Sequence, residues 1–362
     1  MTKEMLHMRP IQRLMERLPA GADAALVVSG HNRRYLTGFP SSAGVVLATR
    51  ETALFLTDFR YIEAARRAVT GMECVEYSSL KETLVDLARR FSLHCILTED
   101  EGMTVAEQRR FSAMLPDVEW KSGVLDGLLG ELRLVKSPQE LEKIKQAQAL
   151  TEYGFDHILG FIRPGRTERE VALELEFLIR RQGAEGVAFD FIVVSGANSS
   201  LPHGVPGDKV IEKGDFVTMD FGARVDGWHS DMTRTVAVGS CSPEQRKVYD
   251  TVLRAQKAAL SVLRAGLRCV DGDAAAREVI AGAGYGEYFG HATGHGVGVE
   301  IHEQPRLSPR SGEEVLSAGS VVTVEPGIYL PGRFGVRIED MASITEGGCE
   351  NLTKSPKELL IL

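Results

Sequence analysis

The sequence predicts a two-domain α+β protein, in which a smaller α/β domain precedes a larger domain with an internal pseudo-twofold duplication. Three observations support this. The chain has 362 residues, which is more than one ordinary hydrophobic core accommodates. Residues 1–125 alternate short β-rich runs with helical patterns, as an α/β domain does. Residues 137–362 contain the same predicted order of elements twice, with two helices followed by strands.

Composition narrows the class of protein. With 43% hydrophobic and 25% charged residues, the chain resembles a soluble globular protein. A net charge of −8 disfavours nucleic acid or an anionic membrane as the main partner, because both require a basic face. The five cysteines show no CxxC spacing, so neither a disulfide framework nor a zinc knuckle is predicted, and a cytoplasmic location fits. We expect no signal peptide and no membrane span.

The first domain is expected over residues 1–125, followed by a linker over 126–136. We expect no catalytic cluster in this domain. Its predicted strands cover residues 25–28, 44–47, 53–56 and 95–97, and its predicted helices cover residues 62–69, 80–91 and 105–114.

The second domain is expected over residues 137–362, and its helix starts are marked by capping boxes. Ser137 is followed three residues later by Glu140, with Pro138 at the first helical position, which is typical of a helix N-terminus. The pattern recurs at Thr167 and again at Ser242. The repeated helix pairs predict one sheet built from two related halves, with helices on its back and a cleft between the halves.

Residues 214–235 have the pattern of a β-hairpin. Strand-like runs flank Asp226-Gly227, which is a strong turn signal. Asp220 and Asp231 are eleven residues apart, and across an even-numbered loop this spacing places both on one face, opposite or one diagonal step apart. Two carboxylates that close repel each other unless a cation lies between them or one takes up a proton. The alternative is that they are two unrelated surface acids.

The segment 290–303 contains three histidines, His291, His295 and His302. Its many glycines exclude a stable helix, so we expect these histidines on extended or loop backbone that allows close approach of a ligand. His302-Glu303 begins like an HExxH zinc helix, but position 306 is arginine, so that motif is excluded.

Two further acids follow. Glu325 closes an apolar run at a Pro-Gly turn, and Glu339 lies two residues after Arg337, so that a strand would place both on one face. Each feature alone has an ordinary structural explanation. Together, four carboxylates and one imidazole form an oxygen-rich set that manganese prefers and that cobalt, iron or zinc accept, and without metal the carboxylates would be costly to bring together. The set is Asp220, Asp231, His295, Glu325 and Glu339.

The motifs DFG-x7-SDMTRT, GHGVGVEIHE, VEPG and VRIED occur in the order found in the pita-bread metallopeptidases, a family that includes aminopeptidase P, prolidase and methionine aminopeptidase. The second domain resembles that family throughout. Residues 31–39 and 56–61 are similar to the creatinase-type domain that precedes the catalytic domain of prolidases and aminopeptidase P. Methionine aminopeptidases usually lack such a domain.

The resemblance implies a site with two divalent ions, most readily Mn²⁺. Asp220 would chelate one ion, His295 and Glu325 would bind the other, and Asp231 and Glu339 would bridge the two. Bound divalent ions lower the pKa of water and polarise a scissile carbonyl.

The resemblance also implies roles around the ions. Glu325 would act as the base. His302, together with His291, would hydrogen-bond the tetrahedral oxyanion. His203 would contact the substrate near the leaving side, and Arg337 would hold the bridging carboxylates in place.

The implied activity is hydrolysis of the bond between an N-terminal residue and a following proline. The alternative is a dipeptidase of the prolidase type, and less favoured readings are a metal-free creatinase-like hydrolase and a methionine aminopeptidase. The proline preference and an expected homodimer come from the resemblance alone. His229 departs from the family pattern, which usually has tyrosine nearby, and is interpreted as structural.

Overall fold

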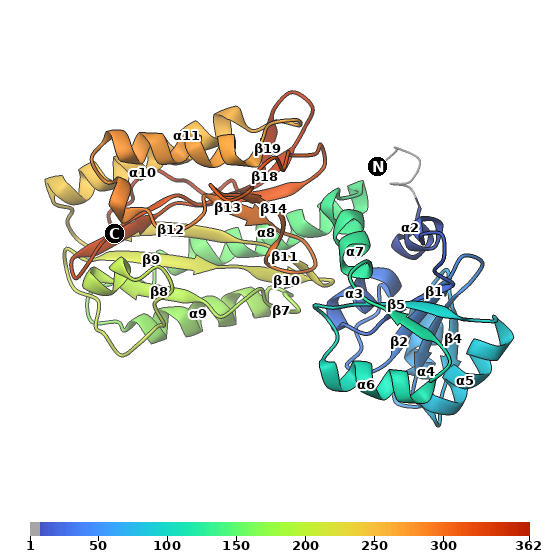
Figure 1. Cartoon of the computed structure of the whole chain (residues 1–362). Helices are drawn as coiled ribbons and strands as arrows, with labels where there is room; N and C mark the ends of the chain where they lie inside the picture. Colours follow the sequence, from blue (N-terminus) through green and yellow to red (C-terminus); the bar gives the residue numbers. More distant parts are fainter. Residues whose placement is uncertain (1–7) are drawn as a thin grey trace. The chain divides into compact units, whose positions relative to one another are not determined.

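The computed structural model describes residues 8–362, and the chain divides into two compact units, Met1–Arg133 and Leu134–Leu362 (Figure 1). Most of the segment expected to be a linker is helix α7, Leu125–Leu134. Leu125, Leu129 and Leu132 are buried along one side of it, so an apolar stripe at helical spacing explains why this segment is helical.

The first unit is built on a mixed sheet with the strand order β4-β3-β2-β1-β5-β6. The expected strands and helices are present to within about two residues, whereas α2, α3, β4 and β6 were not expected. Strands β4 and β6 lie at the two edges and are largely exposed, so they lack the apolar pattern by which a strand is recognised. The strands are β1 Ala24–Val27, β2 Val45–Thr49, β3 Ala53–Thr57, β4 Glu73–Glu76, β5 Cys95–Thr98 and β6 Glu119–Lys121. The helices are α2 Pro10–Arg17, α3 Gly30–Thr37, α4 Ile62–Ala68, α5 Leu80–Arg90 and α6 Val105–Met114.

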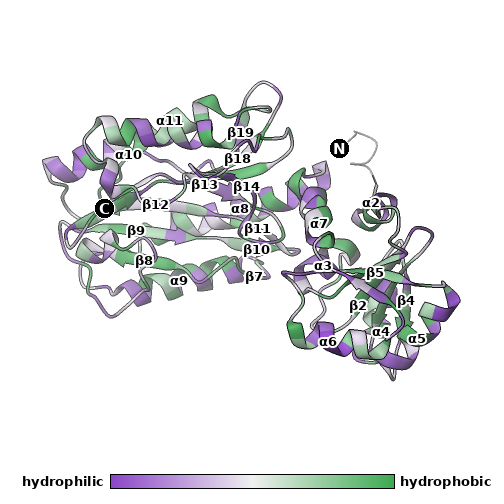
Figure 2. Ribbon diagram, viewed as in Figure 1, coloured by the Kyte–Doolittle hydropathy of each residue, from purple (hydrophilic) through white to green (hydrophobic). Residues whose placement is uncertain are grey.

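The second unit contains the two expected helix pairs. The first pair is α8 Pro138–Ile158 with α9 Glu168–Arg181, and the second is α10 Pro243–Val262 with α11 Cys269–Gly282. Capping boxes start α8, α9 and α10, as the sequence predicts. Figure 1 shows the strands between α9 on one side and α10 with α11 on the other. Figure 2 shows that α10 and α11 carry both hydrophobic and hydrophilic residues, so each can bury one side and expose the other.

The strands of the second unit form several short sheets. A three-stranded sheet β12-β9-β8 belongs to the first half, and a five-stranded sheet β14-β13-β15-β18-β19 belongs to the second. Smaller sheets are β11-β10-β7 and β16-β17. The bounds are β7 Gly186–Val187, β8 Ile192–Ser195, β9 Phe216–Phe221, β10 Ala223–Val225, β11 Trp228–His229, β12 Met232–Ala237, β13 Gly294–Gly296, β14 Glu303–Leu307, β15 Val321–Val324, β16 Gly327–Leu330, β17 Phe334–Arg337, β18 Asp340–Ile344 and β19 Cys349–Asn351. Each half has its own apolar core between helices and strands.

The predicted hairpin is present, with a two-residue turn at Asp226-Gly227. Both turn residues have positive φ, 50° and 83°, as a type I′ turn requires. The strands are interrupted midway, which was not expected. A Cβ at Gly222 would lie 1.9 Å from the carbonyl oxygen of Ser230, so only glycine fits where the two strands come this close.

The interruption places the two acids of the hairpin. Asp220 lies in β9 opposite Thr233 of β12. Asp231 follows β11 and precedes β12, two residues before Thr233. It is therefore one diagonal step from Asp220, as the spacing predicts.

Residues 8–362 include no helix that is both long enough and apolar enough to span a membrane.

A buried ion pair anchors the end of the chain to the second unit. Arg234 of β12 and Asp340 of β18 are 2.8 Å apart, with their side chains 1% and 0% exposed. The Arg234 guanidinium also donates to the carbonyl oxygens of Ser355 and Pro356 at 2.8 and 3.0 Å. Two strands and the C-terminal segment therefore meet on one cation.

Asp340→Asn is expected to lower the free energy of unfolding by about 3–5 kcal/mol, because it leaves the Arg234 charge buried without its counter-charge. The measurement is denaturant unfolding. Asp271→Asn is the matched control, since Asp271 pairs with Arg268 at 2.7 Å on the surface, and it is expected to cause no measurable change. Equal stability of the Asp340→Asn protein and the unmodified protein would contradict a stabilising role for the buried pair.

Candidate metal centre

The second unit contains a cavity of about 740 Å³. All nine candidate site residues line it, although they are spread over more than 130 positions of the sequence. They are His203, Asp220, Asp231, His291, His295, His302, Glu325, Arg337 and Glu339.

The two acids of the first half reach the cavity from the hairpin. Asp220 is the last residue but one of β9, and Asp231 lies at the interruption between β11 and β12. The ladder between β9 and β12 fixes the backbone on both sides of Asp220 and after Asp231, and the pairing of β10 with β11 fixes the backbone before Asp231. Asp220 therefore extends from a paired strand, and Asp231 extends from the junction between two paired strands.

The three candidate ligands of the second half come from strand β13 and from two strand ends. His295 lies at the centre of β13, and Glu325 directly follows β15. Glu339 does not lie on a strand as expected, because β17 ends at Arg337 and β18 begins at Asp340. Instead, its backbone N–H donates to the carbonyl oxygen of Thr233 at 3.1 Å, which ties it to the hairpin of the first half.

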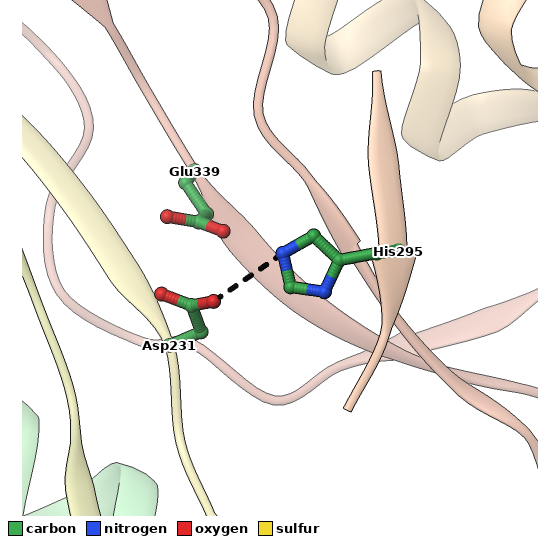
Figure 3. A group of neighbouring side chains, drawn as sticks. All are labelled: Asp231, His295 and Glu339. Atoms are coloured by element: carbon green, nitrogen blue, oxygen red, sulfur yellow. Dashed lines mark ion pairs between the residues drawn. The ribbon is translucent and has the colours of Figure 1, made fainter. Parts of the chain in front are cut away.

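Three of the five candidate ligands form a tight group (Figure 3). One ligand atom each of Asp231, His295 and Glu339 lies within 4.8 Å of the other two. His295 Nε2 is 3.6 Å from Asp231 Oδ2 and 3.3 Å from Glu325 Oε1. His295 Nδ1 is 3.1 Å from the carbonyl oxygen of Gly296, so Nδ1 carries the proton that it donates there and Nε2 faces the carboxylates.

The carboxylates destabilise one another in the absence of a cation. Burial, together with the charges of Glu339, Asp220 and Glu325, raises the pKa of Asp231 well above its usual value. Burial and the neighbouring acids raise the pKa of Glu339 well above its usual value too. Within residues 8–362, the buried atoms Asp220 Oδ1 and Glu339 Oε1 have no hydrogen-bond partner. Buried, unpartnered oxygen atoms of like charge around one cavity fit divalent cations.

Glu325 and His295 behave differently from the other acids. Burial opposes ionisation of Glu325, but the hydrogen bond and charge of His295, with the charge of Arg337, lower the pKa of Glu325 to about 2. Burial also opposes protonation of His295, yet Glu325 raises the pKa of His295. Without metal, each of the two therefore favours the charged form of the other. A divalent ion must displace the imidazole proton, because histidine coordinates as the neutral ring.

Arg337 supports the acids from behind, though not as predicted. Its Nη2 is 2.7 Å from Asp220 Oδ2, and its Nε donates to Thr233 Oγ1 at 3.0 Å. That hydroxyl in turn donates to Glu339 Oε2 at 2.8 Å. Arg337 was expected to hold Asp231 and Glu339. It reaches Glu339 only through the Thr233 hydroxyl, and none of its described hydrogen bonds goes to Asp231.

Tyr329 is a site residue that the sequence analysis missed. Its hydroxyl is 2.9 Å from His291 Nε2 and 2.8 Å from Arg337 Nη1. Burial raises the pKa of Tyr329 to about 12, so it remains a neutral phenol. Only the register of β16 and β17 could have indicated a role for Tyr329. Gly327 lies opposite Arg337, so Tyr329 is one diagonal step from Arg337.

The remaining histidines differ in how free their rings are. His291 Nδ1 is 2.8 Å from the carbonyl oxygen of Ala292, so both of its nitrogens are occupied. The His302 ring lies edge-on to the His295 ring, with centroids 4.4 Å apart. His203 is exposed on the loop after β8. The buried His229 binds the carbonyl oxygen of Gly298 through Nδ1 at 3.0 Å and does not line the cavity, in agreement with its structural interpretation.

Comparison with known proteins gives matches along almost the whole chain. A model of metallopeptidase family M24 matches residues 142–346, and a model of the creatinase/prolidase N-terminal domain matches residues 9–135. The Xaa-Pro dipeptidase of Pyrococcus furiosus is 42% identical over 295 residues, covering 79% of this chain and 84% of the relative. The structure of an Xaa-Pro dipeptidase from Bacillus anthracis has a TM-score of 0.94 at 46% identity, covering 98% of this chain and 99% of that chain. The X-Pro aminopeptidase structure from Thermotoga maritima MSB8 has a TM-score of 0.91 at 39% identity, covering 96% and 100%.

Asp231→Asn is expected to stabilise the metal-free protein at neutral pH. Folding raises the pKa of this carboxyl, so the folded state binds its proton more tightly than the unfolded state does. Between the unfolded and the folded pKa, the free energy of unfolding therefore falls as the pH rises. Removing the charge should therefore raise the Tm of the metal-free protein at pH 7 by several degrees, and should lower the Tm gain on adding Mn²⁺. The measurement is thermal unfolding with and without metal.

The matched control is Asp226→Asn in the turn of the same hairpin, where asparagine is equally suited to positive φ. It should leave both the metal-free Tm and the Mn²⁺ response unchanged. A metal-free Asp231→Asn protein that melts at or below the Tm of the unmodified protein would show that this carboxylate is not a source of repulsion.

Proposed function

The chain belongs to metallopeptidase family M24, and from this premise we propose that it hydrolyses the peptide bond between an N-terminal residue and a following proline. The observation that carries the proposal is the convergence of four carboxylates and one imidazole on one cavity. Relatives that resemble this chain over nearly its whole length are named Xaa-Pro dipeptidase or X-Pro aminopeptidase.

We propose that the site holds two divalent ions. Asp220 would bind one, His295 and Glu325 the other, and Asp231 and Glu339 both. The donor set favours Mn²⁺ and accepts Co²⁺, Zn²⁺ or Fe²⁺. When bound, such ions supply a nucleophile at neutral pH by lowering the pKa of water, and they polarise the scissile carbonyl.

Glu325 is the proposed base. Its carboxylate lines the cavity beside His295, where it would take a proton from the attacking water. Thr323 Oγ1 donates to Glu325 Oε1 at 3.1 Å and so orients it, leaving the other oxygen to carry the proton to the leaving nitrogen.

His302 is the proposed donor to the oxyanion. His291, for which the same role was expected, has both ring nitrogens occupied by Ala292 and Tyr329. We therefore assign His291 to holding the Tyr329 hydroxyl against Arg337. Burial lowers the pKa of His302, so its neutral ring can present an N–H to developing negative charge.

The cavity wall suits a proline ring. It is largely apolar away from the metal ligands, and its apolar lining comprises Phe189, Phe191, Ile192, Pro202, Val205, Pro206 and Ile301. A compact apolar ring would bury against such a wall. His203 lines the same wall, where it can contact the substrate on the leaving side.

A specific feature favours the dipeptidase alternative. Arg306 lines the cavity and lies opposite His295 in the pairing of β13 with β14. A guanidinium at that position can bind the carboxylate of a dipeptide, which a longer substrate lacks there. The sequence alone gives Arg306 no role at the site, because its only use there is to exclude an HExxH motif.

Two finer features are also proposed. We expect a homodimer, which light scattering of the purified protein measures. We further propose a cytoplasmic location, which the five free thiols support.

His302→Ala is expected to lower kcat for Xaa-Pro substrates about 10²–10³-fold, the effect of removing one oxyanion donor. The metal content, measured by emission spectrometry, should stay unchanged because His302 is not among the proposed ligands. His157→Ala, at an exposed position of α8, is the control and should leave kcat unaltered. A full kcat in the His302→Ala protein would remove this residue from the mechanism.

Arg306→Gln is expected to raise KM about tenfold or more for Xaa-Pro dipeptides, and much less for Xaa-Pro tripeptides, because only the dipeptide loses its charged partner. The measurement is a length series of Xaa-Pro substrates on apo protein to which Mn²⁺, Co²⁺ or Zn²⁺ is returned. Arg310→Gln, at an exposed position outside the cavity lining, is the control.

The same series tests the activity itself. Preference for longer substrates supports an aminopeptidase, and preference for dipeptides supports the prolidase alternative. Full activity after metal removal, or preferential cleavage of Met-Gly peptides, would contradict the proposed function.

A further inference from the structure

We propose that Glu168 is a positioning residue that fixes the loop carrying His203. This loop, called the His203 loop below, comprises residues 196–207 and joins β8 towards β9. The proposal rests on the proposed function only where it assigns His203 to substrate contact. The position of the loop itself is a structural matter that can be tested separately.

One carboxylate holds both ends of the His203 loop. Glu168 is the first residue of α9 and is 0% exposed. Its Oε1 accepts from the backbone N–H and the hydroxyl of Ser195 at 2.7 and 3.0 Å, and from Asn198 Nδ2 at 3.1 Å. Its Oε2 accepts from the Gly207 N–H at 3.2 Å. The residue before the loop and the last residue of the loop are thus joined through a single side chain.

The tip of the His203 loop is largely exposed to solvent. His203 is exposed, and Val205 is 84% exposed, so the tip buries little apolar surface of its own. The middle of the loop touches the site through two hydrogen bonds, from Gly335 N to Ser199 Oγ at 2.9 Å and from Arg337 Nη1 to the Pro202 carbonyl at 3.2 Å. A shift of the loop ends would therefore be felt directly at the cavity wall.

The other half of the unit uses the same device. Asp273 of α11 is 1% exposed and accepts from the N–H and the hydroxyl of Thr293 at 3.0 and 2.9 Å. It also pairs with Arg277, which donates to the carbonyl oxygens of Phe289 and His291 at 2.9 and 2.8 Å. In each half, the second helix thus presents a buried carboxylate to the segment that carries a cavity histidine. This parallel supports a positioning role for Glu168.

The chemistry of the cluster requires a carboxylate. Glu168 receives only donors, from Ser195, Asn198 and Gly207, and an ionised carboxylate only accepts. Glutamine has nearly the same shape, but its amide group would point two N–H donors at donors on one side. Glu168→Gln should therefore weaken the attachment of one end of the loop while filling the same volume.

The test compares Glu168→Gln with Glu170→Gln, two residues further along the same helix. Glu170 forms the capping box with Thr167 and does not contact the His203 loop. We expect Glu168→Gln to increase hydrogen exchange in residues 196–207 and to lower kcat/KM for Xaa-Pro substrates about 10–100-fold, with metal content retained. Glu170→Gln should change neither.

A double-mutant cycle separates positioning from general weakening. If Glu168 acts through His203, then Glu168→Gln should cost little further activity in a His203→Ala background. Independent, multiplying losses would overturn the proposal, as would unchanged exchange in residues 196–207. If the protein cleaves no Xaa-Pro bond, the proposed function fails while the exchange measurement still decides the role of Glu168. If Glu168→Gln does not fold, Asn198→Ala removes one donor and should give the same loop-confined increase in exchange, whose absence would likewise overturn the proposal.

Discussion

One unfavourable interaction constrains the second unit, because four carboxylates face a single cavity and repel one another. Burial and neighbouring charge raise the pKa values of Asp231 and Glu339 well above their usual range. Bringing these carboxylates together therefore lowers the stability of the metal-free folded chain. Close to these carboxylates lie the Arg337 guanidinium, 2.7 Å from Asp220, and the His295 imidazole, 3.3 Å from Glu325. A site of this kind is electrostatically incomplete without divalent ions, and ion binding therefore adds to folding stability.

The fold tolerates this repulsion because three of the four acids stand where strands end or are interrupted. Asp231 lies at the interruption of the hairpin near Gly222, Glu325 directly follows β15, and Glu339 separates β17 from β18. The ladders on either side satisfy the backbone and fix its course, so each side chain can turn into the cavity without a loss of sheet hydrogen bonds. Because both halves contribute, the hydrogen bond from Glu339 to the Thr233 carbonyl links the halves at the point where the candidate ligands meet.

The sequence predicted those features that are local or periodic. Capping boxes, the Asp226-Gly227 turn and the five candidate ligands each have a signature within a short stretch. Tyr329 and Glu168 have none, because a polar residue acquires its role from a partner that the register or the packing of another element brings to it. The capping box at Ser137 predicts a domain boundary and hence a linker over residues 126–136, but the apolar stripe of α7 makes most of this segment helical. Strands β4 and β6 escaped detection because exposed edge strands lack alternation.

The division of roles among the cavity histidines follows from the fact that a guanidinium can only donate hydrogen bonds. Since Arg337 donates to the Tyr329 oxygen, the phenolic proton is directed to His291 Nε2, and the remaining ring proton of His291 goes to the Ala292 carbonyl. Burial lowers the pKa of His291 and raises that of Tyr329 to about 12. Both side chains therefore stay neutral, and the direction of these hydrogen bonds does not reverse near neutral pH. His291 is thereby committed to this network, which supports the proposal that His302, of the two rings expected at the oxyanion, meets the substrate.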